Sequence, residues 1–399
     1  MICVLITLSV LLLIQIFRYK LYKSSLALLY WAVVNSFVTP ALYYSILNGD
    51  SYLGFTQSDY SLYLVFGLFF LGCLLIFNFV QIHYRNIIHQ RIKKVVSFNG
   101  VAKYYSVILI VFVCGYILIF RNGLPLFQLF NSSSPLDSLE RPDVTGALPH
   151  YFTVQTIASA VIPLFYFYFY SRRNWTKVQN LVYILFVVFF MTVGGNKGLL
   201  LYFFLFLWIY VWGMKVDWKI ISSGAFCLFL YEMIMIGRAG FSSSLLNILG
   251  APLRRFFVTQ GAMMINRIAL ISKGYDFEDH YISADVFTYV FGQPGGSAPT
   301  FFAGDFFVRF GYAIGLILSV VIIMFLYLMS IEIDGYQKEK LHIQWYFYFL
   351  LYLLEMSTID SGFIIRMIIM TGSLYVLSID KCNYKIRYPK FKLVVKRRQ

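Results

Sequence analysis

The chain has 399 residues, of which 60% are hydrophobic and 20% aromatic, and its formal net charge is +15 at pH 7. This composition excludes an ordinary water-soluble domain, in which about half of the residues are polar. The charge does not indicate a nucleic-acid-binding protein, because such proteins gather Lys and Arg on one water-facing surface, whereas here these residues lie between apolar runs. The sequence therefore indicates an integral membrane protein, with membrane lipids around it and no nucleic acid as partner.

Apolar stretches recur along the whole chain, and many approach the length needed to cross the bilayer as a helix. They predict about eleven transmembrane helices, at residues 1–17, 26–47, 61–82, 106–120, 151–171, 179–193, 199–213, 219–236, 305–330, 341–354 and 362–379. The first stretch has no positively charged region before it and no small-residue cleavage site, so we expect a retained helix. Residues 1–399 are thus expected to form a single polytopic, all-α integral membrane domain.

The positions of Lys and Arg predict the orientation, because basic loops stay in the cytoplasm. With the N-terminus outside, the predicted cytoplasmic segments are rich in basic residues, at 18–23, 85–103, 172–177, 215–219, 338–340 and the tail 381–399. The predicted outer loops 48–60 and 355–361 contain no Lys or Arg. We therefore expect the N-terminus outside and the C-terminus in the cytoplasm.

Two long outer segments separate the predicted spans, at 121–150 and 237–304. Apolar stretches in the second, 245–253 and 256–271, are too short or too interrupted to cross the bilayer, so they predict amphipathic helices at the membrane surface. The second segment also carries several arginines, an acidic run and the glycine-rich stretch 292–297. An outer loop rich in arginine departs from the positive-inside tendency, which indicates that these arginines have a specific role.

Arginine is well suited to bind pyrophosphate, because its planar guanidinium donates paired hydrogen bonds and keeps its charge. Our candidate pyrophosphate ligands are Arg238, Arg254, Arg255, Arg267, Lys197 and Arg309. The spacing of Arg255 and Arg267 would place both on one face of a helix. Alternatively, the arginines bind anionic lipid headgroups or pair with the acidic residues Asp276, Glu278 and Asp279.

Two of these candidates have structural alternatives of their own. Lys197 lies in a Gly-Gly-Asn-Lys-Gly stretch, which would present backbone N–H groups and one cation to an anion, or would form only a tight turn with a snorkelling lysine. Asp305 and Arg309 are spaced to form an i, i+4 pair at the start of a span, which would equally be a structural ion pair.

Activation of a hydroxyl group requires a general base. The candidates are His280, Asp276, Glu278, Asp279 and Asp305, although a single loop histidine is often a bystander. The sequence contains no HExxH motif, no GxSxG motif and no GxxxxGK[ST] phosphate loop, so we expect no metal, nucleotide or other cofactor.

The chain resembles the O-antigen polymerases of the Wzy type. The resemblance rests on the many Phe- and Tyr-rich spans, the Gly-Asn-Lys-Gly turn and the large outer loop late in the chain. Within that loop it rests on the stretches 252–256 (PLRRF) and 295–300 (GGSAPT), which lead to the stretch 309–315 (RFGYAIG) just after the loop.

This resemblance implies a GT-C-like bundle in the bacterial inner membrane, with a periplasmic N-terminus. It implies a metal-independent glycosyltransferase that polymerises undecaprenyl-pyrophosphate-linked oligosaccharide repeat units, one serving as donor and one as acceptor. A chain-length-regulating co-polymerase would be a partner. The alternatives are an O-antigen ligase, which uses the same donor, and a flippase or transporter for lipid-linked sugars. A flippase would more often show repeated halves, which are not evident here. A membrane acyltransferase would be favoured by a histidine within a span, and the five histidines all fall in loops or at span ends.

Overall fold

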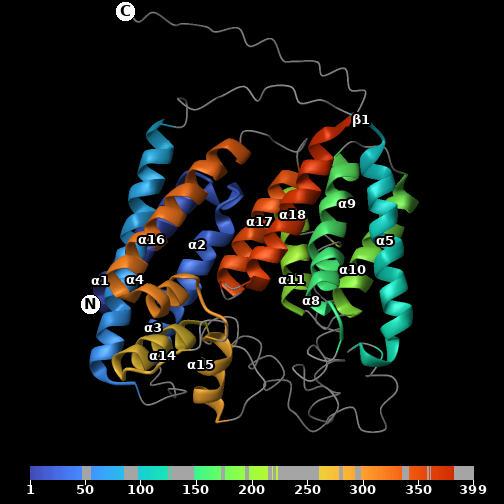
Figure 1. The fold of residues 1–399 in the computed structure, drawn as a ribbon. Helices are drawn as coiled ribbons and strands as arrows, with labels where there is room; N and C mark the ends of the chain where they lie inside the picture. The colour runs from blue at the N-terminus through green and yellow to red at the C-terminus, as the bar shows by residue number, and fades with distance from the viewer. Residues whose placement is uncertain are drawn as a thin grey trace, which may run out of the picture.

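The computed structural model describes residues 1–46, 55–84, 98–124, 127, 148–171, 176–193, 197–213, 218, 222, 260–277, 282–292, 298–334, 341–356, 359 and 361–381. This part of the chain is helical, apart from one two-residue parallel pairing between β1 (Phe98–Asn99) and β2 (Asp380–Lys381). Long helices run side by side as a bundle, and two shorter helices lie across one end of it (Figure 1). The expected all-helical architecture is therefore confirmed.

The helices of the bundle without a π-helical turn are α1 (Ile2–Arg18), α4 (Gln57–Tyr84), α5 (Val101–Phe120), α10 (Lys177–Val193), α16 (Ala303–Asp334), α17 (Leu341–Met356) and α18 (Ser361–Ile379), and α16 is broken at Gly311. Other helices contain a π-helical turn, and these are α2 (Ala27–Val33) with η2 (Val34–Val38) and α3 (Thr39–Ile46), α8 (Tyr151–Thr156) with η4 (Ile157–Val161) and α9 (Ile162–Ser171), and α11 (Lys197–Phe206) with η5 (Leu207–Val211). The short elements are η1 (Leu21–Lys23), η3 (Arg121–Gly123), α14 (Gln260–Ser272) and α15 (Ile282–Phe291).

The described helices include 4 that are long and apolar enough to cross a membrane, at Gln57–Val80, Val101–Gly123, Tyr151–Ser171 and Ala303–Ile331. Shorter apolar helices of 10–17 residues accompany them. These helices suggest a membrane protein. The count of about eleven spans stays a prediction, and the span predicted at 219–236 lies outside the described residues except for residue 222.

Side-chain hydrogen bonds satisfy backbone carbonyls at two of the π-helical turns. The hydroxyl of Tyr63 donates to the carbonyls of Ser36 and Phe37 in η2, at 2.8 and 3.1 Å. The indole Nε1 of Trp345 donates to the carbonyl of Ala160 in η4, at 2.9 Å. A π-helical turn disturbs the regular helical hydrogen bonds, so these donors stabilise it within the bundle.

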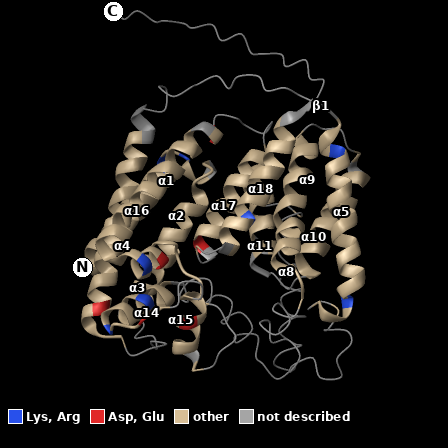
Figure 2. Ribbon diagram, viewed as in Figure 1, with Lys and Arg blue, Asp and Glu red and all other residues tan. Residues whose placement is uncertain are grey.

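The bundle has two ends, which we name the β1 end, where β1 pairs with β2, and the α14 end, where α14 and α15 lie (Figure 1). At the β1 end, the carboxylate of Asp334 accepts hydrogen bonds from the hydroxyl of Ser24 and the N–H of Ser25, at 2.6 and 2.7 Å. At the α14 end, the N–H of Phe302 donates to the carbonyl of Leu354, at 2.9 Å. Charged residues in the described part gather mostly toward these ends (Figure 2).

The described parts of the predicted outer loops lie together at the α14 end, and those of the predicted cytoplasmic loops lie at the β1 end (Figure 1). At the α14 end are residues 55–56, 121–124, 148–150 and 260–277. At the β1 end are residues 20–25, 98–103 and 380–381. The assignment of the α14 end to the outer side stays a prediction from the charge distribution.

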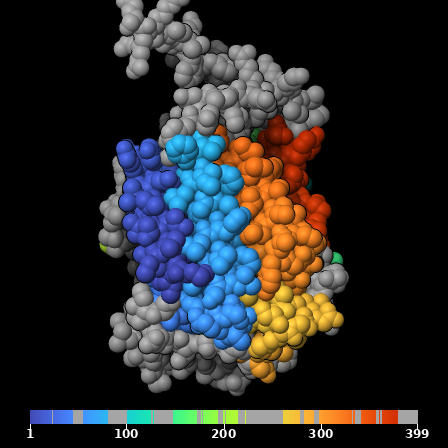
Figure 3. Space-filling view, turned by 90° about the vertical axis from the view of Figure 1, so that its left-hand side faces the viewer, coloured from blue at the N-terminus to red at the C-terminus, as the bar shows by residue number. Residues whose placement is uncertain are grey.

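Large apolar side chains are exposed along the outside of the bundle. On α5, Ile108, Leu118 and Ile119 are 63%, 72% and 75% exposed. Figure 3 shows α1, α4 and α16 side by side on one face of the molecule. A contiguous apolar surface of this kind is unfavourable in water and favourable against lipid chains.

Helix α14 differs from its prediction. It overlaps the stretch 256–271, for which we expected an amphipathic helix at the membrane surface, but every residue from Gly261 to Leu270 is buried. Contacts with η2, α3, α4, α15 and α16 surround it. At Gly261 a Cβ atom would overlap Pro40, so the close approach of α14 to α3 requires glycine. The surface-helix prediction is wrong here because these tertiary contacts leave no side of α14 to the lipid; the stretch 245–253 lies outside the described residues.

Candidate functional site

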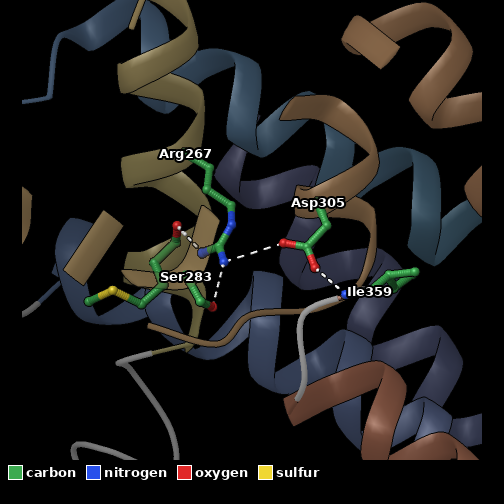
Figure 4. Close-up of polar contacts among 5 residues, drawn as sticks. Arg267, Ser283, Asp305 and Ile359 are labelled. Atoms are coloured by element: carbon green, nitrogen blue, oxygen red, sulfur yellow. Dashed lines mark hydrogen bonds and ion pairs between the residues drawn. The ribbon is translucent and has the colours of Figure 1, made fainter. Parts of the chain in front are cut away.

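A buried ion pair at the α14 end joins α14 to the beginning of α16 (Figure 4). Nη2 of Arg267 lies 3.4 Å from Oδ1 of Asp305, and the two side chains are 0% and 1% exposed. The other carboxylate oxygen of Asp305 accepts a hydrogen bond from the backbone N–H of Ile359, at 3.0 Å. The pair therefore holds together α14, the start of α16 and the connection between α17 and α18.

The guanidinium of Arg267 is incompletely partnered. Its Nη1 donates to the carbonyl of Met263 and its Nη2 to the hydroxyl of Ser283, both at 3.3 Å (Figure 4). Its Nε has no hydrogen-bond partner among the described residues. Hydrogen bonds from arginine to anionic oxygens are typically about 2.7–2.9 Å. A fully buried cation with long contacts and an unused donor is costly, which favours a further anionic ligand at this position.

Burial lowers the pKa of the Arg267 guanidinium, and the nearby Asp305 carboxylate acts in the opposite direction. Arginine nevertheless stays protonated in proteins, because its pKa starts far above neutral pH. The site therefore contains a permanent positive charge in a place from which water is excluded.

Two glycines in α16 shape this site. Gly304 lies where a Cβ atom would be 2.8 Å from Cγ2 of Thr300 and 3.0 Å from Cδ of Arg267, so it allows α16 to approach α14. Gly311 has φ 71° and ψ 171°, which breaks the helix. We predicted one span at 305–330, but Asp305 and Arg309 lie in the short segment before this break. The difference arises because a backbone with this φ is readily adopted only by glycine.

The other predicted cations lie in different situations. Arg309 is half-buried one turn after Asp305 and interacts electrostatically with its carboxylate, while the ion pair recorded for Asp305 is with Arg267. Lys197 is the first residue of α11, and its side chain lies outside the described part. Arg238, Arg254 and Arg255 lie outside the described residues, so their role as pyrophosphate ligands stays a prediction.

The predicted general bases also differ in their burial and in their partners. Asp305 is buried and engaged with Arg267 and Ile359, whereas Asp276 is exposed just after α14. The partner recorded for Arg267 is Asp305, not Asp276 from the acidic run that we considered. Glu278, Asp279 and His280 lie outside the described residues.

One buried carboxylate was missed in the sequence. Glu355 is in the last turn of α17 and is 1% exposed. Its Oε2 accepts a hydrogen bond from the hydroxyl of Tyr202 at 2.7 Å, and the side chain of Asn35 lies beside the carboxylate. In the sequence, Glu355 is the first residue of the predicted outer loop 355–361, directly after a predicted span. That position was the available signal, because ionisable groups at span ends are frequently functional.

At the α14 end the described residues thus place one buried cation, Arg267, and the buried carboxylates of Asp305 and Glu355, while a third buried carboxylate, Asp59, caps α4. A buried cation suits the binding of a polyanion, and a buried carboxylate suits the transfer of a proton. Within the described ranges, no group of three or more His, Cys, Asp and Glu residues is arranged to hold a metal ion. Comparisons with protein-family models, curated proteins and solved structures find no significant match to this chain.

Proposed function

We propose that this protein is a membrane-embedded glycosyltransferase that polymerises undecaprenyl-pyrophosphate-linked oligosaccharide repeat units on the outer face of the bacterial inner membrane. The observation that carries this proposal is the fully buried guanidinium of Arg267, which has long contacts and an unused Nε. Pyrophosphate offers the closely spaced anionic oxygens that such a guanidinium binds best. The resemblance of the sequence to the O-antigen polymerases supports the same substrate class.

In this proposal, Arg267 binds the pyrophosphate of the donor, and Asp305 holds the guanidinium in position. Arg238, Arg254, Arg255, Arg309 and Lys197 complete the anion site. Negative charge grows on the pyrophosphate as the bond to the sugar breaks, so a fixed positive charge in a dry environment stabilises the transition state more than the ground state. The departing pyrophosphate is already a good leaving group, which removes the need for nucleotide activation.

The proposal is tested by displaying surface polysaccharide on gels from cells in which the chromosomal gene has been deleted. We expect the deletion to leave a lipid core that bears a single repeat unit, and the wild-type protein to restore the ladder of longer chains. Arg267→Lys keeps the charge but loses the planar pair of donors, so we expect it not to restore the ladder at matched membrane expression.

The matched control is Arg121→Ala, which removes an exposed arginine at the same end of the bundle and should restore the ladder. A deletion strain that lacks even the single-unit band would contradict polymerisation and favour ligation or flipping of the lipid-linked unit. An Arg267→Lys variant that restores a full ladder would show that the guanidinium of Arg267 is dispensable.

A further inference from the structure

Glu355 is a buried carboxylate with one engaged oxygen and one unused oxygen. Oε2 accepts the hydroxyl hydrogen of Tyr202 at 2.7 Å, and the side chain of Asn35 lies beside the carboxylate. Oε1 has no hydrogen-bond partner among the described residues. The described ion pairs include none with Glu355. A glutamate that served only to join helices would be expected to have both oxygens satisfied.

The surroundings of Glu355 are apolar and aromatic. Among the described residues, the titratable groups that face it are the phenols of Tyr202 on α11 and Tyr348 on α17, and η2 contributes the neutral Asn35. The ring of Tyr202 packs against that of Tyr352, with centroids 4.8 Å apart. This packing fixes the hydroxyl of Tyr202 and, through it, the orientation of the Glu355 carboxylate.

Glu355 and the Arg267–Asp305 pair lie at the same end of the bundle and are joined through short backbone links. Leu354, next to Glu355, accepts the hydrogen bond from the N–H of Phe302, which lies just before α16. Ile359, in the same connection between α17 and α18, donates to Asp305. The backbone next to Glu355 is therefore anchored to the start of α16, which carries the Asp305 partner of Arg267.

We infer that Glu355 is the proton acceptor of the glycosyl transfer, an inference that rests on the proposed function. Oε1 of Glu355 takes the proton from the hydroxyl of the acceptor sugar. The acceptor oxygen forms a bond to the anomeric carbon of the donor, and the bond between that carbon and the pyrophosphate oxygen breaks. The electron pair of the broken bond leaves with the undecaprenyl pyrophosphate, which Arg267 stabilises, and Glu355 later releases its proton to water.

Glu355 suits this role better than Asp305. Asp305 is already committed to other groups, because one carboxylate oxygen lies in the ion pair with Arg267 and the other accepts the N–H of Ile359. Glu355 has a neutral environment and a free oxygen. Tyr202 is then a positioning residue, because it acts on the carboxylate and not on the substrate.

The test uses the purified full-length protein in lipid nanodiscs, supplied with the lipid-linked single repeat units that accumulate in the deletion strain. Glu355→Gln is nearly isosteric and still accepts the hydrogen bond of Tyr202. We expect it to slow polymer formation by about 100-fold or more, while undecaprenyl pyrophosphate alone still raises its thermal unfolding temperature as in the wild type. Asp59→Asn, which alters a carboxylate that caps α4 at the same end, is the control and should polymerise normally.

Tyr202→Phe provides a second, independent readout. Loss of its hydrogen bond removes a contact that favours the ionised carboxylate, so we expect the acid limb of the rate profile to move to higher pH. An unmoved acid limb, or a polymerisation rate of Glu355→Gln within about threefold of the wild-type rate, would overturn the role of Glu355 as proton acceptor. Either result would leave the proposed function standing. If the wild type neither polymerises the lipid-linked units nor is stabilised by undecaprenyl pyrophosphate, the proposed function fails, and this inference fails with it.

Discussion

Gly304 lies directly against Arg267, so that a Cβ atom at position 304 would be 3.0 Å from Cδ of the arginine. The missing side chain of a residue in α16 therefore sets the position of the guanidinium in α14. Any side chain at this position must move Arg267, Thr300 or Met264, all of which are buried.

We expect Gly304→Ala to destabilise the protein by about 1 to 3 kcal/mol, because it overpacks a dense contact between two helices. The measurement is thermal or denaturant unfolding in detergent, followed by tryptophan fluorescence. Gly372→Ala is the matched control, because Gly372 is also helical but has no atom within 4 Å of the position that a Cβ would occupy. The control should change stability by less than about 1 kcal/mol, and equal effects at both positions would contradict the close approach.

Gly311→Ala tests the break in α16. The backbone at Gly311, with φ 71° and ψ 171°, lies in a region essentially restricted to glycine, and a Cβ there costs about 1 to 3 kcal/mol. We expect lower stability together with loss of the polysaccharide ladder, because the segment that carries Asp305 would be displaced. Gly115→Ala in α5, where the glycine has ordinary helical geometry and open space, should retain both properties.

Hydropathy predicted helix positions well because the bilayer requires backbone hydrogen bonds to be satisfied within each span. The stretch 151–171, for example, was predicted as one span and forms α8, η4 and α9 over the same residues. The break at Gly311 was not predicted, since glycine is common in membrane helices and its φ depends on packing. The burial of α14 was missed for a related reason, because the elements that cover it are distant in the sequence.

The sequence predicted most of the residues of the candidate site, but it did not predict which of them form the ion pair. Arg267 and Asp305 were both selected as candidates from the sequence, but with different partners. Asp305 was expected to pair with Arg309, and Arg267 with the acidic run that includes Asp276. Their pairing depends on the packing of α14 against α16, which a charge pattern does not reveal. Glu355 was overlooked because it directly follows an apolar run. At such a position the sequence does not distinguish an exposed loop carboxylate from a buried one.

Variants of the Arg267–Asp305 pair allow its contribution to stability to be measured separately from its contribution to function. We expect Asp305→Asn to destabilise the protein by about 3 to 5 kcal/mol, because it leaves a buried guanidinium without its counter-charge. The double variant Arg267→Met with Asp305→Leu removes both charges and should regain most of the stability measured by thermal unfolding. It should not restore the polysaccharide ladder, and a restored ladder would show that the pair has only a structural role.

Tyr63→Phe tests the polar contact that stabilises η2. The hydroxyl of Tyr63 donates to the carbonyls of Ser36 and Phe37, and Phe at this position removes that buried donor from both carbonyls. We expect a loss of about 1 to 3 kcal/mol in unfolding free energy. Tyr104→Phe, at an exposed tyrosine of α5, is the control and should leave the stability unchanged.

The orientation of the bundle is open to a direct labelling experiment. In a variant without its native cysteines, single cysteines are placed at Asp276, which is exposed at the α14 end, and at Lys103, which is exposed at the β1 end. Because basic loops remain in the cytoplasm, we expect a membrane-impermeant maleimide to label position 276 in intact cells, and position 103 only after the membrane is permeabilised. The reverse pattern would place Arg267, Asp305 and Glu355 toward the cytoplasm. A polymerase of exported lipid-linked units would then be excluded, because its substrates lie on the opposite side of the membrane.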